Sequence, residues 1–165
     1  MAELRIRHCS EEDLEFIESC ETAVYRDEYA FSEKYLQDLL NDVREFATST
    51  TKHREDMWVA ELEGEPVGVI GLKRTFEPDT GRIAFLAVPK GMRKKGVGTH
   101  LMEVALGSAV EWEYSKLTAS IPSTLRTGIL FFIKNGFSLV KTEERTEWRE
   151  TPVLDETWEL KLSDS

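Results

Sequence analysis

The chain has 165 residues, of which 41% are hydrophobic and 32% charged, and its formal net charge is −10. This length and composition predict one globular domain covering residues 1–165, since no linker or low-complexity tract divides the chain. The acidic charge argues against nucleic-acid binding, which needs a broad basic face to neutralise phosphates. No apolar run approaches the roughly 18 residues of a membrane-spanning helix, so no membrane partner is expected.

The cysteines and histidines give no sign of a metal site or of a disulfide framework. The chain has two cysteines, Cys9 and Cys20, and three histidines, and none of them has ligand-like spacing. We therefore expect ordinary thiols and no metal. The first residues lack the apolar core of a signal peptide, which predicts a cytoplasmic protein.

The first half of the chain predicts one strand followed by two helices. Apolar and polar residues alternate over 4–8, as in a strand, and Ser10 with Asp13 forms a capping-box pattern before a first helix. An aromatic stretch, 25–31, interrupts the helical periodicity. Ser32 is then expected to cap a second helix, and the polar stretch 48–55 to form a loop.

From residue 57 onward the pattern changes to that of strands. The predicted strands are 57–62, 67–75, 83–88, 117–121, 137–148 and 153–162. A helix is expected to open at Thr99, and another follows residues 122–124 and ends at Asn135-Gly136. The resulting order, β-α-α-β-β-β-α-β-α-β-β, predicts an α+β fold with a mixed, mostly antiparallel central sheet flanked by helices.

The strongest functional pattern is the glycine-rich basic turn between the strand ended by Pro89 and the helix opened by Thr99. Arg93, Lys94 and Lys95 lie in this turn between Gly91 and Gly96. A strand, a glycine turn and a helix start leave backbone N–H groups that converge on one point, where an anion can bind. The pattern therefore predicts a phosphate or pyrophosphate site, and the alternative is a solvated basic turn.

Two familiar phosphate-binding motifs do not fit this turn. Val97 and Gly98 occupy the positions where a P-loop requires Lys and Ser or Thr. Leu101 replaces the third glycine of the dinucleotide-binding fingerprint, and no run of βαβ units follows. The turn is therefore neither a P-loop nor a Rossmann turn.

A third motif does fit. Arg93-x-x-Gly96-x-Gly98 resembles the acyl-CoA-binding motif of the GNAT superfamily of N-acetyltransferases, Q/R-x-x-G-x-G/A. Residues 125–137, LRTGILFFIKNGF, resemble the second half of a later family motif, N-x-x-A-x-x-L/F-Y-x-K-x-G-F, at Phe131, Lys134, Gly136 and Phe137. The element order also matches that of the GNAT fold, and motif-level resemblance covers residues 85–137.

The resemblance implies that acetyl-CoA is the co-substrate. Its pyrophosphate would be held by Arg93, Lys94, Lys95, Gly96, Val97, Gly98 and Thr99. Its pantetheine arm would lie along the backbone of Leu86, Ala87 and Val88 like an added strand, and Phe132 and Lys134 would complete the site. A backbone N–H at Leu86 or Val88 would stabilise the oxyanion of the tetrahedral intermediate.

The sequence departs from the family at two chemical positions. Arg82 stands where family members often have a glutamate base, which leaves Glu77 and Asp79 in the preceding turn as candidates. Phe132 stands where a tyrosine usually protonates the departing thiolate, so the hydroxyl of Ser120 is our candidate acid. A thiol with a pKa near 8.5 leaves as thiolate at pH 7 for only about 2 kcal/mol more.

The acceptor is expected to be an amine of a small molecule or peptide, attracted by the acidic charge. The segment between the first two helices would contact it, with Glu28, Tyr29 and Phe31 as candidates, although aromatic residues at such spacing also form cores. Resemblance allows a homodimer. The alternative functions are a non-catalytic acyl-CoA sensor and a purely structural domain.

Overall fold

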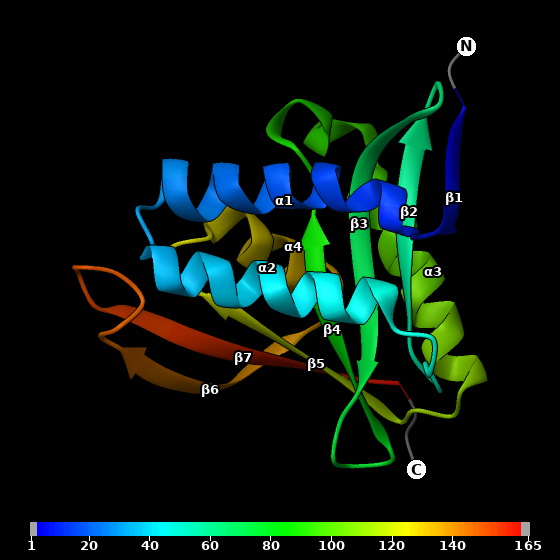
Figure 1. Cartoon of the computed structure of the whole chain (residues 1–165). Coiled ribbons are helices and arrows are strands. Elements are labelled where there is room, and N and C mark those ends of the chain that lie inside the picture. Colours follow the sequence, from blue (N-terminus) through cyan, green and yellow to red (C-terminus); the bar gives the residue numbers. More distant parts are fainter. Residues whose placement is uncertain (1–2, 163–165) are drawn as a thin grey trace.

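A seven-stranded sheet forms the centre of the molecule in the computed structural model, which describes residues 3–162 (Figure 1). Its strand order is β1-β2-β3-β4-β5-β7-β6, and only β4 and β5 are parallel neighbours. The strands are β1 (Leu4–His8), β2 (Asp56–Leu62), β3 (Glu65–Arg74), β4 (Thr80–Ala87), β5 (Lys116–Pro122), β6 (Ser138–Arg145) and β7 (Val153–Lys161).

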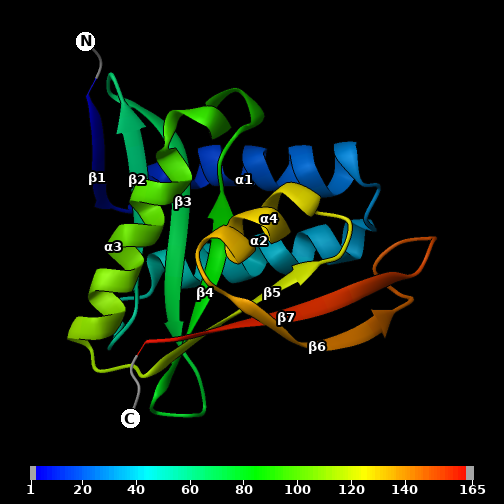
Figure 2. The same ribbon diagram turned by 180° about the vertical axis from the view of Figure 1, so that it is seen from behind.

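Helices cover both faces of this sheet. Figure 1 shows α1 (Leu14–Thr22) and α2 (Glu33–Thr48) on one face, and Figure 2 shows α3 (Val97–Glu111) and α4 (Arg126–Lys134) on the other. The α1 helix continues as a π-helical turn, Ala23–Glu28, and a 3₁₀ turn, Lys90–Lys95, precedes α3. Within residues 3–162, no helix is both long and apolar enough to cross a membrane.

The predicted α+β class and element order are confirmed. The differences lie at element ends. Helix α3 begins at Val97 rather than Thr99, because Gly96 adopts a left-handed φ of 77° that ends the 3₁₀ turn and starts the helix there. Strand β6 ends at Arg145, earlier than predicted, and the chain then turns so that Trp148 accepts a backbone hydrogen bond from Ser32 (2.7 Å).

Both predicted helix caps are present and fix how α1 and α2 start. The Ser10 backbone N–H donates to the Asp13 carboxylate (2.9 Å), and the Ser32 hydroxyl accepts from the Tyr35 N–H (3.1 Å). Arg7 of β1 also binds the buried Asp13 carboxylate with two hydrogen bonds of 2.9 Å. This ion pair anchors the start of α1 to the edge of the sheet.

The sheet opens at its centre, between β4 and β5. These strands pair only from Thr80–Lys116 to Ile83–Ala119, after which β5 pairs with β7 alone. On the other side, the register of β4 with β3 shifts between Val69 and Gly71, and Phe85 has a left-handed φ of 57°. The bulge and the diverging strands leave the β5-facing edge of β4 without a ladder partner after Ile83.

Helix α3 packs so closely on β3 that the strand needs a glycine at the contact. A Cβ on Gly68 would lie 2.7 Å from Val97 Cγ1 and 3.0 Å from Leu101 Cδ1, whereas a Cβ on Gly107 meets nothing within 4 Å. We predict that Gly68→Ala lowers the free energy of unfolding by about 1–3 kcal/mol through overpacking. Gly107→Ala, its control in the exposed middle of α3, should raise it by about 0.5–1 kcal/mol. Chemical denaturation measures both, and equal effects would contradict this packing.

Candidate active site

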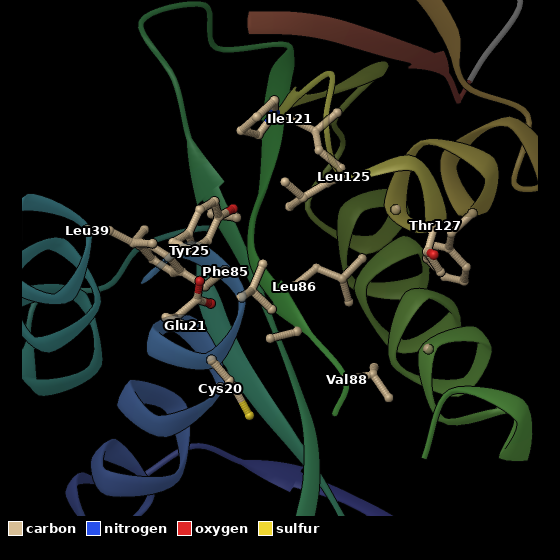
Figure 3. Close-up of a pocket in the computed structure, with 18 of the residues that line it drawn as sticks. Cys20, Glu21, Tyr25, Leu39, Phe85, Leu86, Val88, Ile121, Leu125 and Thr127 are labelled. Carbon is tan, nitrogen blue, oxygen red and sulfur yellow. The ribbon is translucent and has the colours of Figure 1, made fainter. Parts of the chain in front are cut away.

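A cavity of about 1350 Å³ lies where β4 and β5 separate (Figure 3). Every residue of the segment 82–90 lines it, and so do side chains from helices on both faces of the sheet. Figure 3 shows Phe85 directed toward α1 and α2, and Leu86 and Val88 toward the opposite side. The cavity therefore passes by the open edge of β4 and has one end on each face.

The end near α3 and α4 is cationic and rich in glycine. Arg93 and Lys134 line it, together with Gly96, Gly98 and Thr99. The Arg93 Nε donates a hydrogen bond to the Val88 carbonyl (3.1 Å), which ties the basic turn to the end of β4.

Helix α3 presents its N-terminus at the same place. It has no side-chain cap, and its first i to i−4 bond runs from the His100 N–H to the Gly96 carbonyl (3.1 Å). The N–H groups of residues 97–99 precede that bond and lack a helical partner. An uncapped helix start and two cations, Arg93 and Lys134, at one end of a long cavity suit a diphosphate.

Most residues predicted to bind the cofactor line this cavity. They are Leu86, Ala87, Val88, Arg93, Gly96, Gly98, Thr99, Phe132 and Lys134. Val97 is different, because its side chain is fully buried in the core and leaves only its backbone for binding. Among the described residues, Lys95 is exposed and does not line the cavity, and the side chain of Lys94 lies outside what the structure describes.

Gly128 stands where the family motif has alanine, and the structure shows what fills the space. A Cβ at Gly128 would lie 2.5 Å from Ile121 Cδ1. The Ile121 side chain of β5 therefore occupies the volume that an alanine methyl group would need, and both residues line the cavity.

Of the three predicted acid–base residues, one lines the cavity and the other two are absent from its described lining. Ser120 is exposed on β5 and lines the cavity. Glu77 and Asp79 lie in the turn before β4 and are absent from the described lining of the cavity. The Asp79 carbonyl instead accepts backbone hydrogen bonds from Ser115 and Lys116 (2.8 and 3.2 Å), which is a structural role. The position of Glu77 and Asp79 outside this lining argues against a role as the base.

Two of the three residues predicted to contact the acceptor line the cavity, and the third packs behind its wall. Glu28 and Tyr29 line the cavity, with a Lys90 Nζ 3.5 Å from the Glu28 carboxylate. Phe31 is only 4% exposed and packs on Tyr25 and Tyr35, with ring centroids 5.2 and 4.7 Å away. Phe31 supports the cavity wall from behind and is not part of the described lining.

Sequence reasoning missed Glu21, a buried carboxylate that lines the end of the cavity near α1 and α2. Its side chain is 5% exposed, and burial raises its pKa from the usual 4.5 to about 8. Among the residues that the structure describes, none forms a hydrogen bond or ion pair with it. The signal was present in the sequence, because Glu21 follows Ile17 by one helical turn on the inward face of α1.

A sheet with this strand order, open beside its central strand, defines an acetyltransferase fold. The model of the acetyltransferase (GNAT) family matches residues 14–137, so the chain belongs to that family. No curated protein matches the sequence.

Three solved structures show the same fold. A GNAT-family acetyltransferase from Staphylococcus aureus Mu50 is 16% identical with a TM-score of 0.78, covering 98% of this chain and 100% of its own. A ribosomal-protein-alanine N-acetyltransferase from Brucella melitensis is 20% identical with a TM-score of 0.77, covering 95% and 99%. The PaiA N-acetyltransferase from Thermoplasma acidophilum, in complex with coenzyme A, is 20% identical with a TM-score of 0.77, covering 96% and 99%.

The raised pKa of Glu21 predicts a pH-dependent cost to stability. The native state holds this proton between pH 4.5 and 8 and the unfolded state does not, so the free energy of unfolding falls as pH rises through that window. Glu21→Gln should therefore be more stable than wild type at pH 9, by on the order of 3–5 kcal/mol, and gain nothing at pH 4. Denaturant titrations at both pH values measure this, with the exposed Asp27→Asn as control. Equal stability of Glu21→Gln and wild type at pH 9 would contradict it.

Proposed function

We propose that this protein is an N-acetyltransferase that moves the acetyl group of acetyl-CoA to an amine by direct attack on the thioester. The observation that carries the proposal is the single cavity that joins the cationic turn before α3 to the open edge of β4. Membership of the GNAT acetyltransferase family and a structural neighbour with coenzyme A bound support the use of acyl-CoA. No observation favours the non-catalytic sensor.

The chain's own groups suit the two parts of the cofactor. Arg93, Lys134 and the free amides at the start of α3 would neutralise the pyrophosphate. The backbone of Leu86, Ala87 and Val88 would pair with the amides of the pantetheine arm as a missing neighbouring strand would. The thioester would then lie beside β4, between the two ends of the cavity.

The chemistry needs a neutral amine and a stabilised intermediate. An alkylammonium with a pKa near 10.4 costs roughly 4–5 kcal/mol to deprotonate at pH 7, so a base must take its proton. The amine nitrogen then attacks the thioester carbon, and a backbone N–H at Leu86 or Val88 would hold the oxyanion. Collapse breaks the carbon–sulfur bond, and Ser120 would give its hydroxyl proton to the thiolate while it takes the proton that the nitrogen loses.

Replacing Arg93 tests the cofactor site. We predict that Arg93→Glu weakens coenzyme A binding more than tenfold, because it reverses a charge at the pyrophosphate and removes the bond to the Val88 carbonyl. Lys161→Glu makes the same charge change at an exposed site on β7 and should leave the affinity unchanged. Isothermal titration calorimetry measures both. An unchanged affinity in Arg93→Glu would remove the pyrophosphate assignment.

Replacing Ser120 tests the acid. Because the unprotonated thiolate route costs about 2 kcal/mol at pH 7, Ser120→Ala should lower kcat there by at most about thirtyfold. The loss should vanish above pH 8.5, where the thiolate leaves without help. Release of free thiol gives the rates. A loss that is the same at pH 7 and pH 9 would exclude Ser120 as a proton donor.

A further inference from the structure

The two ends of the cavity carry opposite charge. Cations gather at the α3 and α4 end, whereas the end near α1 and α2 is lined by the carboxylates Glu21, Glu28, Asp38 and Asp42. Two of these have local partners, since Glu28 lies 3.5 Å from Lys90 and Asp38 lies 2.8 Å from Lys34. An anionic co-substrate at one end leaves the acidic end for a cation.

Glu21 is the deepest of these carboxylates. It is 5% exposed, whereas Asp38 and Asp42 lie on exposed positions of α2. Figure 3 shows its carboxylate directed toward Tyr25 and Phe85, in the part of the cavity that borders β4. A buried carboxylate without a partner in the described chain is costly, and a cation entering the cavity would remove that cost.

The walls around Glu21 are apolar and aromatic. Phe16, Tyr25, Leu39 and Phe85 line this end of the cavity. Tyr25 belongs to the π-helical turn after α1, a rare geometry that is frequent at functional sites, and Phe85 is the left-handed residue of the β4 bulge. This end of the cavity thus combines one buried carboxylate with an apolar surface on which the apolar part of a ligand can pack.

We propose that the acceptor is a primary alkylammonium with an apolar or aromatic body, and that Glu21 binds its ammonium group and takes its proton. The inference rests on the proposed function and names the substrate class and the base for it. Glu21 reaches the acceptor from α1, on the face of the sheet opposite the cationic turn.

The proton balance of this step is complete. Glu21 takes one proton from R–NH3⁺, and the freed lone pair forms the nitrogen–carbon bond with the thioester carbonyl. The nitrogen gives up a second proton as the carbon–sulfur bond breaks, and that proton ends on the thiolate. The products are R–NH–acetyl and coenzyme A thiol, with one proton passed from Glu21 to solvent.

The titratable groups that interact with Glu21 are neutral at pH 7, because the pKa of each is raised. They are Cys20 on its own helix, Tyr25 in the following turn and Tyr35 on α2, and burial raises the pKa of each, with a contribution from the Glu21 charge. The charged residues Asp38, Asp42, Arg82 and Asp155 line the same cavity. Burial therefore disfavours the negative charge on Glu21 until an ammonium arrives. Because burial keeps Glu21 protonated near pH 7, ammonium binding should release that proton.

The test is calorimetry with phenethylamine as the probe and coenzyme A already bound. At pH 7, in two buffers of different ionisation enthalpy, wild type should release close to one proton per phenethylamine bound. Glu21→Gln should release none and bind at least tenfold more weakly, and Glu21→Asp should retain the release. Asp27→Asn, which removes an exposed carboxylate outside the described lining, should behave as wild type.

The outcomes separate this inference from the proposed function. Retained coenzyme A binding in Glu21→Gln shows that the variant is folded, and acetylation of phenethylamine by wild type supports the activity. If wild type acetylates phenethylamine and Glu21→Gln does so with the same kcat/KM, the role of Glu21 is wrong while the function stands. If coenzyme A binds but phenethylamine does not, the substrate class is wrong. Absence of coenzyme A binding in wild type would overturn the proposed function itself.

Discussion

The site depends on the separation of β4 and β5 after Ile83. Backbone N–H and C=O groups of a central strand normally pair on both sides, and here one side of β4 is left facing a cavity. The bulge at Phe85 and the pairing of β5 with β7 alone maintain the opening. Everything else in the site is arranged around this one edge.

The opening also connects the two faces of the sheet. On one face, the turn before α3 and helix α4 supply cations, and the start of α3 supplies free amides. On the other face, α1, the turn that follows it and α2 supply carboxylates and aromatic rings. A reaction between an anionic acyl donor and a cationic acceptor is suited to such a division, because each partner is attracted to its own end. The two substrates would then meet beside β4.

The replacement of a family tyrosine by Phe132 fits this environment. Phe132 is 4% exposed and packs on Phe137, with ring centroids 5.1 Å apart. The ring contributes to the core as well as to the cavity wall, and thiolate departure at neutral pH needs little assistance. Loss of the hydroxyl is therefore compatible with the proposed chemistry.

The sequence by itself determined the order of the elements, both serine caps and the basic glycine turn. Those features depend on neighbours within a few residues, such as Ser32 with Tyr35 or Gly96 before α3, so local patterns report them. Only the tertiary structure decided which carboxylates reach the cavity. Glu77 and Asp79 precede β4 in the chain yet lie away from the described lining, whereas Glu21 arrives from α1 because Arg7 and Asp13 fix that helix against the sheet. Such an encounter across the sheet depends on packing between distant segments, which local sequence patterns do not encode.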